Sequence, residues 1–588
     1  PEPIEALKQR LPAVYDELYQ TQELLEKHYR DMQDIEFTVQ EGRFYILQTR
    51  SGKRTGRASV KIAVDMVNEG LIDEKEALLR VSPEHVEAFL HPMVDPTAKT
   101  DIVANGLPAS PGGATGEIVF SAEEAEEVAA TGKSVILVRR ETTPEDIHGM
   151  KVAAGILTEL GGMTSHAAVV ARGMGVCAIT GCGSLTINYA EGTAQTDDGV
   201  VMKRGDIITL DGTSGEVMLG DIPKTEASSS DDFQNLLSWA DKHRRLKVRA
   251  NAETPEDAAR ARELGAEGIG LCRTEHMFFE AKRIEQMRAM ILAESSDERQ
   301  KYLDALEAFQ RADMLELFKV MDGLPVTIRL LDPPLHEFLP HDEADMQALA
   351  ESVGKPVEKI RAIAEDLAEV NPMLGFRGCR LSIVYPEITE MQVRAIMSAA
   401  ADAVEQGFKP LPEIMIPLVV NVREIRLISE IIDRGVQAVL RERLVSVPYK
   451  VGTMMETPRA TLGADRLAPE VEFMSFGTND LTQMTYGFSR DDVGKFIARY
   501  IEKKLVDADP IVTLDQRAVG RLMEMAITES RKVKKGIKYG ICGEHGGDPR
   551  SIRFCHNLGL DYVSCSPFRV PIARIAAAQA HVEASKDD

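Results

Sequence analysis

The stretch VGTMMETPRA, residues 451–460, contains a short apolar run that ends at Met455 and is followed at once by Glu456. The next apolar run lies in FMSFGTNDLTQMTYG, residues 473–487, and is followed by polar residues up to Asp480. Apolar runs of this length that alternate with helical stretches predict β–α repeats and a parallel sheet. Glu456 and Asp480 are therefore expected at the ends of adjacent strands.

The same alternation continues from Lys247 to the end of the chain. About eight such repeats over roughly 250 or more residues fit a (β/α)8 barrel, and the predicted fold class is α/β. One of nine candidate strands must then be a rim loop, and we assign residues 375–379 to it because this run is short and rich in Gly and Arg. The other eight candidates are residues 248–250, 268–271, 326–331, 414–419, 451–455, 473–475, 539–542 and 562–564.

Polar residues follow the ends of several of these strands. Arg273, Glu275, Asp332, Glu456 and Asp480 each come shortly after a predicted strand end. The active site of a barrel lies at the carboxyl ends of its strands. Their convergence on one mouth is a stronger signal than any one of these residues alone.

The first part of the chain differs from the barrel region in its pattern of apolar and glycine residues. Residues 1–100 contain helical patterns and a strand–turn–strand between Ile35 and Gln48. Residues 101–220 contain short β-rich runs, glycine pairs and intervening helices, which predict a compact α/β domain. Residues 221–240 begin with small polar residues and are predicted to form a linker.

Composition excludes several classes of protein. A net charge of −24 opposes nonspecific binding to nucleic acid. Seven cysteines without a CxxC pair indicate neither a disulfide framework nor a structural zinc site, and predict a reducing compartment. No apolar stretch is long enough to span a membrane, and no leader or address tag is recognisable, so we expect a cytoplasmic protein. Because the chain begins at Pro1, we expect a truncated or processed product.

The segment GGMTSHAAVVARG, residues 161–173, is a candidate phosphate site. Thr164 or Ser165 can cap a helix that starts here, which places His166 in its first turn. The N–H groups and the positive dipole end of a helix favour phosphate, and neutral imidazole is a nucleophile. A capping histidine without chemistry is the alternative, and spacing alone does not separate the two.

This segment closely resembles the phosphohistidine signature of the phosphoenolpyruvate-utilising enzymes. The family includes the pyruvate phosphate dikinases, the phosphoenolpyruvate synthases and enzyme I of the sugar phosphotransferase system. Before His166 the chain has Met163-Thr164-Ser165, which are the residues that the dikinases have at these positions of the signature. The resemblance implies that His166 carries the phosphoryl group. Thr164 matches a position that plant dikinases phosphorylate for regulation, with a plain capping role as the alternative.

The two barrel stretches resemble metal-binding strands of the same family. Mg²⁺ takes hard oxygen ligands, usually one or two carboxylates plus substrate oxygens, and Glu456 and Asp480 would supply the carboxylates. Arg273 and Arg329 match family arginines that hold the transferring phosphoryl group. Arg377 is expected to help, with a structural ion pair as the alternative. The resemblance implies that phosphoenolpyruvate or pyruvate is bound by these arginines and by Glu456, Gly477, Thr478, Asn479 and Asp480.

Cys542 lies in YGICGEHGGD, at the end of a predicted strand. A buried cysteine is normally an inert small hydrophobe. The matching cysteine of the dikinases protonates the methylene carbon of the enolate. An ordinary thiol pKa of about 8.5 would allow that role near neutrality. The resemblance therefore implies that Cys542 is the second catalytic residue.

The segment DIEFTVQEGRFYILQTRSGKRT, residues 34–55, resembles the last strands of the dikinase ATP-grasp domain. Glu36 and Gln48 match positions that contact Mg²⁺ and nucleotide there. No glycine-rich phosphate loop is present. We therefore expect a chain that lacks most of that domain and has no ATP site, so that ATP and phosphate are used only with the missing part.

The resemblance implies an order of domains and a reaction. The expected order is an ATP-grasp remnant with a helical connector (1–100), a swivelling phosphohistidine domain (101–220), a linker (221–240) and a barrel that binds phosphoenolpyruvate and pyruvate (241–588). His166 would take the phosphoryl group from phosphoenolpyruvate and leave pyruvate. Residues 97–106 and 221–231 are the predicted hinges, and a homodimer through the barrel is a family expectation.

Three alternatives remain. The chain could be a synthase, an enzyme I, or a phosphocarrier module with no catalysis of its own. The Met-Thr-Ser sequence before His166 and the ATP-grasp remnant argue against enzyme I. A phosphocarrier has no need of a proton donor or of metal-binding carboxylates. The presence of all the barrel site residues therefore argues against the phosphocarrier alternative.

Overall fold

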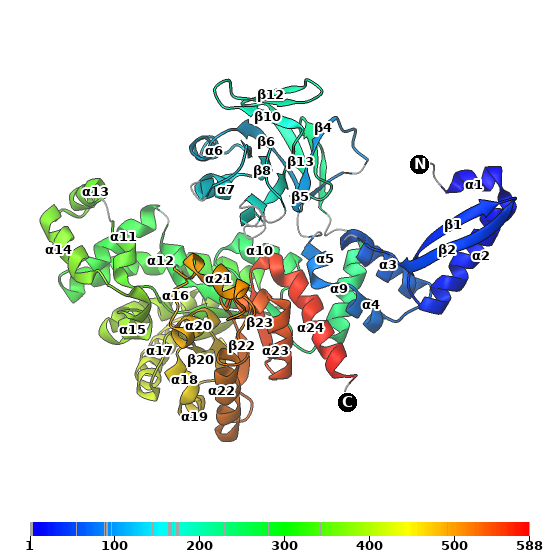
Figure 1. The fold of residues 1–588 in the computed structure, drawn as a ribbon. Coiled ribbons are helices and arrows are strands. Elements are labelled where there is room, and N and C mark those ends of the chain that lie inside the picture. Colours follow the sequence, from blue (N-terminus) through cyan, green and yellow to red (C-terminus); the bar gives the residue numbers. More distant parts are fainter. Residues whose placement is uncertain are drawn as a thin grey trace. The chain divides into compact units, whose positions relative to one another are not determined.

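The computed structural model describes the chain except residues 1–3, 55, 88, 90–91, 96, 144–145, 163–166, 169, 172–175, 227–229, 280, 341–342, 491 and 587–588. The chain folds into two compact units, Pro1–Trp239 and Ala240–Asp588 (Figure 1). No helix in the described ranges is long and apolar enough to cross a membrane.

The second unit is a closed parallel barrel whose strands follow sequence order. All eight predicted strands are confirmed. Residues 375–379, the rim segment, form no barrel strand, as predicted: residues 375–378 follow a 3-10 turn, and Cys379 begins the short helix α15 (Cys379–Val384). Each strand pairs with the next along the chain, and the last pairs with the first. The strands are β16 (Lys247–Asn251), β17 (Ile269–Arg273), β18 (Pro325–Arg329), β19 (Leu411–Ile416), β20 (Lys450–Met455), β21 (Phe473–Phe476), β22 (Lys538–Ile541) and β23 (Tyr562–Cys565).

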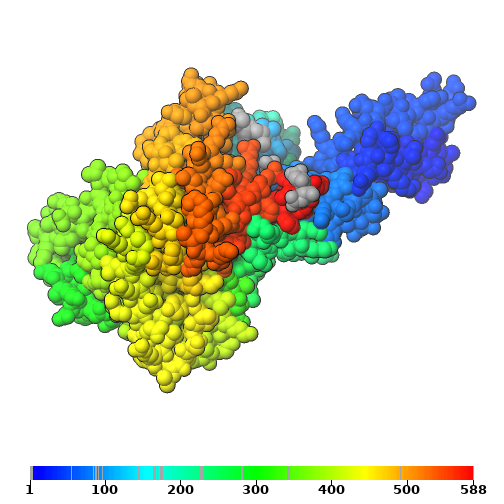
Figure 2. Space-filling model, turned by 90° about the horizontal axis from the view of Figure 1, so that it is seen from below, coloured from blue at the N-terminus to red at the C-terminus, as the bar shows by residue number. Residues whose placement is uncertain are grey.

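Helices surround these strands and bury their apolar faces against them. Local signals start several helices: the side chain of Thr254 caps the helix that follows β16, and Asn421 and Glu424 form a capping box after β19. In the space-filling view the repeats follow one another around the unit, from green through yellow and orange to red (Figure 2). The main helices are α10 (Pro255–Glu263), α12 (Ser296–Val320), α16 (Pro386–Glu405), α17 (Val422–Arg443), α20 (Thr478–Tyr486), α22 (Val519–Val533), α23 (Pro549–Asn557) and α24 (Val570–Ala584).

The barrel interior contains a buried ion pair. Arg249 Nη1 lies 2.7 Å from Glu413 Oε2, and both side chains are 4% exposed. Thr327 Oγ1 donates to the same carboxylate oxygen at 2.9 Å, and Lys538 Nζ lies 3.2 Å from the other one. The Arg249 guanidinium also stacks over the ring of Tyr562, 4.0 Å from its centroid. These side chains come from five different strands, so the pair fastens strands that are far apart in the sequence.

The first unit contains an eight-stranded sheet in the order β4-β14-β13-β6-β7-β8-β9-β5. The four strands from β6 to β9 are parallel, whereas the outer strands pair antiparallel. Helix α6 (Ala122–Ala129) is capped by the side chain of Ser121, and α7 (Ile147–Val152) leads into β8. The strands are β4 (Ile102–Asn105), β5 (Leu107–Ser110), β6 (Gly113–Val119), β7 (Val135–Arg139), β8 (Gly155–Thr158), β9 (Cys177–Thr180), β13 (Ile207–Asp211) and β14 (Glu216–Leu219).

Eight strands of this unit were not predicted. They are β4, β5, β9, the pair β3 (Pro92–Val94) and β15 (Lys224–Glu226), and the separate three-stranded sheet of β10 (Leu185–Asn188), β11 (Thr193–Thr196) and β12 (Val201–Lys203). Each has only three or four residues, which is too short for a two-residue alternation to stand out. β5 also contains Pro108, which lowers its apparent strand tendency.

The two predicted hinges are only partly unstructured. Residues 102–105 form β4, an edge strand paired with β14, so the prediction of a hinge over 97–106 is wrong for that part. Lys224–Glu226 forms β15, which pairs antiparallel with β3 (Pro92–Val94). The backbone groups of both segments are therefore satisfied within a ladder, which small polar side chains do not reveal. Residues 227–229 lie outside the described ranges, and the domain boundaries stay predictions.

The N-terminal hairpin is confirmed. Glu41 and Gly42 both have positive φ, 51° and 74°, which is the backbone of a two-residue hairpin turn. Glu36 and Gln48 face each other across the hairpin, and both are exposed. The elements around it are α1 (Glu5–Arg10), α2 (Pro12–Tyr29), β1 (Gln33–Gln40), β2 (Arg43–Ser51), α3 (Gly56–Asn68) and α4 (Glu74–Arg80).

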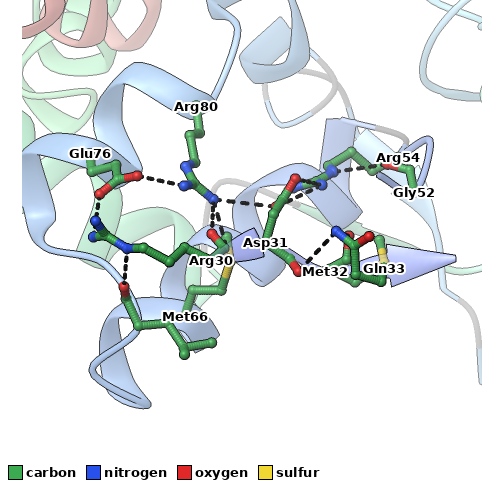
Figure 3. Close-up of polar contacts among 10 residues, drawn as sticks. Arg30, Asp31, Met32, Gln33, Gly52, Arg54, Met66, Glu76 and Arg80 are labelled. Carbon is green, nitrogen blue, oxygen red and sulfur yellow. Dashed lines mark hydrogen bonds and ion pairs between the residues drawn. The ribbon is translucent and has the colours of Figure 1, made fainter. Parts of the chain in front are cut away.

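Ion pairs tie this hairpin to the helices that follow it (Figure 3). Asp31 accepts from Arg54 Nη2 at 2.9 and 3.0 Å and lies 3.3 Å from Arg80 Nη1. Glu76 joins Arg80 to Arg30, whose Nη2 is 2.8 Å from its carboxylate. The cluster therefore connects the start of β1, the segment after β2 and helix α4.

Replacing Glu413 by Gln should lower the free energy of unfolding by about 3–5 kcal/mol, because Arg249 is left as an uncompensated buried charge. Glu529→Gln is the matched control, since Glu529 pairs with Lys532 at 2.6 Å on an exposed helix face and should cost less than about 1 kcal/mol. Urea denaturation followed by circular dichroism measures both. A similar small cost for the two variants would contradict the fastening role of the buried pair.

Candidate active site

A cavity of about 240 Å³ opens at the carboxyl ends of the barrel strands. It contains the barrel residues that the sequence singled out as a site, except Thr478, together with residues that it did not. The lining residues are Leu271, Arg273, Arg329, Asp332, Arg377, Met454, Glu456, Gly477, Asn479, Asp480, Gln483, Arg490, Cys542 and Gly543.

Two arginines share one carboxylate at the centre of this cavity. Arg329, the last residue of β18, pairs through Nη1 with Asp332 Oδ2 at 2.8 Å and through Nη2 with Glu275. Arg377 comes from the rim segment and also bonds Asp332, with its Nε 3.3 Å from Oδ1. Its Nη1 lies 3.3 Å from Asp480 Oδ1. Both guanidinium groups are thus held in place before any ligand arrives.

The charges in this network support one another. Burial alone would raise the pKa of Asp332, but the positive charges of Arg329 and Arg377 outweigh it and lower the pKa. Burial likewise opposes the charge on Arg329, yet the neighbouring carboxylates of Asp332 and Glu275 raise its pKa. The Nε–H of Arg329 has no hydrogen-bond partner among the described residues. This buried donor is therefore free to bind an anion.

Arg273 is held separately from the other two arginines. It ends β17, and its Nη1 lies 2.9 Å from Glu253 Oε1. The ion pair leaves Arg273 on the cavity wall as a further cation. The sequence pointed to Asp332 and Glu275 at strand ends but not to their role as partners of Arg329, and it gave no signal for Glu253.

Glu456 is fully buried at the end of β20. Its Oε1 accepts from the backbone N–H of Leu418 at 2.5 Å, whereas its Oε2 has no partner in the described part of the chain. Leu418 has a φ of 56°, and such a strained backbone is often found at a functional site. Burial, together with the charges of Asp332 and Asp480, raises the pKa of Glu456 well above its usual range.

These residues fit a divalent cation. An unpaired buried carboxylate oxygen beside a second carboxylate, Asp480, is a donor set of the kind that Mg²⁺ prefers. No group of three or more His, Cys, Asp and Glu side chains gathers as a metal site within the described ranges. Two protein carboxylates would leave the remaining coordination positions to substrate oxygens and water.

The turn from Gly477 to Asp480 fits closely against Glu456. A Cβ on Gly477 would lie 2.9 Å from Glu456 Oε2 and 2.8 Å from Met454 Sδ. Any larger residue at position 477 would therefore crowd the carboxylate oxygen of Glu456. Helix α20 starts at the next residue and carries Asn479 and Asp480 in its first turn. The sequence predicted this cluster from its position after β21, and the cavity contains Gly477, Asn479 and Asp480.

Cys542 follows β22 and is 1% exposed. Its Sγ lies 3.6 Å from the carbonyl oxygen of Phe476. Burial raises the pKa of the Cys542 thiol to about 11. The thiol is therefore a weaker acid than an ordinary cysteine and keeps its proton throughout the neutral range.

The other predicted site residues do not line this cavity or are not described. Thr478 is absent from its wall. His166 and Thr164 lie outside the described residues. Glu36 and Gln48 belong to the other unit, where they sit opposite each other on an exposed hairpin. Gln483 and Arg490 line the cavity and were missed, because nothing in their spacing separates them from other polar residues of a helix and loop.

In metal-free protein, alkylation of Cys542 by iodoacetamide should still rise about tenfold per pH unit near pH 9.5, because only the thiolate reacts and its pKa is about 11. Glutathione in the same solution is the control, and its rate should rise far less with pH, because most of its thiol is already ionised at about pH 9.5. Peptide mapping by mass spectrometry gives the rate at Cys542. A plateau near the ordinary thiol pKa of about 8.5 would contradict the effect of burial.

Comparison with known proteins assigns all three parts of the chain. Residues 227–582 match the family described as "PEP-utilising enzyme, PEP-binding domain", and residues 131–215 match "PEP-utilising enzyme, mobile domain". Residues 8–71 match "Pyruvate phosphate dikinase, AMP/ATP-binding domain". The nucleotide-binding domain is thus represented, and the expectation that the chain lacks most of it is not supported.

Curated relatives match almost the whole chain. It is 52% identical over 583 residues to a pyruvate, phosphate dikinase of Clostridium symbiosum, covering 99% of the chain and 67% of that protein. It is 54% identical to the dikinase of Rhizobium meliloti (strain 1021), covering 98% and 64%, and 54% identical to a chloroplastic dikinase of Mesembryanthemum crystallinum, covering 98% and 61%. The chain spans roughly 61–67% of the length of these three relatives. The chain therefore belongs to the phosphoenolpyruvate-utilising enzymes, and within them to the pyruvate, phosphate dikinases.

Proposed function

We propose that this protein interconverts phosphoenolpyruvate and pyruvate by passing a phosphoryl group to and from His166. In the complete reaction, ATP, phosphate and pyruvate would give AMP, diphosphate and phosphoenolpyruvate. One observation carries the proposal: the barrel mouth brings fixed arginines, an unpaired carboxylate oxygen on Glu456 and a protonated Cys542 into one cavity.

The arginines suit the charges of the substrate. Phosphoenolpyruvate carries a phosphate and a carboxylate, and guanidinium groups bind both in bidentate fashion. Arg329 and Arg377 are already oriented by Asp332, so binding would cost little side-chain ordering. Arg273 adds positive charge from the β17 side, and Asn479 lines the same cavity.

Mg²⁺ would be held by Glu456 and Asp480, the two carboxylates that fit it. When bound, the ion would neutralise negative charge on the substrate's phosphate and enolate oxygens. A cation at this position would also favour the ionised form of Glu456, whose pKa burial otherwise raises.

The protein's own groups complete the reaction. The imidazole of His166 attacks phosphorus in line, forming a P–N bond as the P–O bond of the enol ester breaks. The departing oxygen keeps the electron pair, which gives the enolate of pyruvate. Arg273 and Arg329 stabilise the charge on the transferring phosphoryl group. The thiol of Cys542 then delivers its proton to the methylene carbon, and a thiol still protonated at neutral pH suits that step.

Other parts of the proposal rest on the resemblance alone. These are regulation at Thr164, nucleotide contacts by Glu36 and Gln48, a homodimer through the barrel, and swivelling of residues 101–220 between two sites. The hinges would be the stretches left between β3 and β4 and between β14 and β15. All seven cysteines are free, which supports a reducing compartment such as the cytoplasm.

The test is single-turnover release of pyruvate after mixing the protein with phosphoenolpyruvate and Mg²⁺. A stoichiometric burst of pyruvate should accompany acid-labile phosphate on the protein. His166→Ala should abolish both, because no nucleophile remains. Cys542→Ala should slow pyruvate formation by about 10²–10⁴-fold, because the general acid is removed.

His148→Ala and Cys555→Ala are the matched controls, since His148 is partly exposed in the first unit and Cys555 is buried outside the cavity. Both should keep the burst. A protein that binds Mg²⁺ and phosphoenolpyruvate yet gives no burst would contradict the proposal. If His166 could be phosphorylated by a separate donor, the phosphocarrier alternative would replace it.

A further inference from the structure

The turn that follows Cys542 is fastened to the first turn of α20. Glu544 donates its backbone N–H to Asn479 Oδ1 at 3.0 Å. His545 Nδ1 lies 2.8 Å from Thr478 Oγ1. A Cβ on Gly543 would lie 2.2 Å from the same hydroxyl oxygen, so the two turns approach as closely as glycine permits. The proton donor and the metal-binding turn are therefore joined by direct contacts.

The surroundings of His545 fix its tautomer. The residue is fully buried, and its Nε2 lies 2.9 Å from the carbonyl oxygen of Pro510. A carbonyl can only accept, so Nε2 must carry the hydrogen. Burial lowers the pKa of His545, which keeps the ring neutral and leaves Nδ1 as an acceptor. The hydroxyl of Thr478 must then donate to Nδ1.

The second contact fixes the amide of Asn479. A backbone N–H can only donate, so the atom facing Glu544 is the amide oxygen of Asn479. The amide nitrogen keeps its two hydrogens for the cavity that Asn479 lines. Asn479 can thus offer donors to an anion, as the proposed substrate requires.

We infer that His545 is a positioning residue: acting through Thr478, it holds the turn of Cys542 and the turn of Asn479 and Asp480 in their reactive arrangement. His545 is not among the residues that line the cavity, so it does not touch the substrate. The inference rests on the proposed function and deepens it, because it names what aligns the proton donor with the substrate-binding turn. Misplacing reacting groups by about 1 Å can cost roughly 10²-fold in rate.

Two replacements of His545 each remove one of its two hydrogen bonds and keep the other. His545→Asn keeps an acceptor in the place of Nδ1 and loses the bond to Pro510. His545→Gln keeps a donor in the place of Nε2 and loses the acceptor for Thr478. A purely structural histidine would make both variants lose activity in proportion to their loss of stability. A positioning role through Thr478 predicts a selective effect of His545→Gln.

The readout is the exchange of pyruvate methyl protons with D₂O in the presence of Mg²⁺, followed by NMR. In the proposed mechanism this exchange needs the barrel cavity and Cys542 but not His166. His545→Gln should lower its kcat by about 10- to 100-fold with little change in KM, while His545→Asn should stay within about fivefold of the unaltered protein. The thermal midpoint is measured for each variant alongside. His556→Gln, at a buried histidine of α23 outside the cavity, should lower stability without lowering kcat.

A second measurement asks whether the effect passes through Thr478. In a Thr478→Val background, His545→Gln should cause no further loss of kcat, because the Thr478 hydroxyl that donates to His545 Nδ1 is already absent. Full exchange activity in His545→Gln would overturn the inference, and so would equal losses in the Gln and Asn variants that follow their thermal midpoints. Absence of exchange in the unaltered protein would contradict the proposed function itself, and the inference would fall with it.

Discussion

The carboxylate of Asp332 is the centre on which the barrel mouth depends. It is 2% exposed and accepts from two guanidinium groups, those of Arg329 and Arg377. A buried charge must be paired, and here each partner is itself paired again, Arg329 with Glu275 and Arg377 with Asp480. The chain of alternating charges joins the ends of three strands and the rim segment, so no member can turn without breaking another pair.

The two ends of the barrel use buried charge differently. Towards the amino ends of the strands, Glu413 has a partner for each carboxylate oxygen: Arg249 and Thr327 on one, and Lys538 on the other. At the mouth, Glu456 uses only one oxygen, and Arg329 leaves its Nε–H unused in the described structure. One end is satisfied by the protein alone and gives stability. The other end leaves a buried acceptor and a buried donor, which is the arrangement expected where a metal ion and an anion complete the site.

The sequence predicted the barrel well because its strands are buried on both faces and therefore appear as uninterrupted apolar runs. It also predicted that Glu456, Asp480 and Cys542 lie near strand ends, because each comes at the end of such a run or shortly after it, and all three line one cavity. It could not predict that Asp332 joins two arginines, because Arg377 comes from a rim segment whose path depends on tertiary contacts.

The remaining differences have similar causes. The pKa of Cys542 depends on burial by neighbours from other strands. The sequence does not show these neighbours, so it predicted only the pKa of an ordinary thiol. His545 looked like one more polar residue after a strand, and only its two hydrogen bonds distinguish it. The strands β10 to β12 are too short for an alternation to stand out, and the pairing of β15 with β3 joins distant segments, which local patterns do not encode.

The central claim is that the barrel mouth binds the enolate of pyruvate through a metal ion on Glu456 and Asp480. The most direct measurement is calorimetric titration with oxalate, a planar dianion that resembles this enolate, with and without Mg²⁺. We predict tight binding only with Mg²⁺, weakened by at least about 100-fold in Glu456→Gln and unchanged in the exposed control Glu529→Gln. Oxalate binding that is equally tight without Mg²⁺, or unaffected by Glu456→Gln, would contradict the claim.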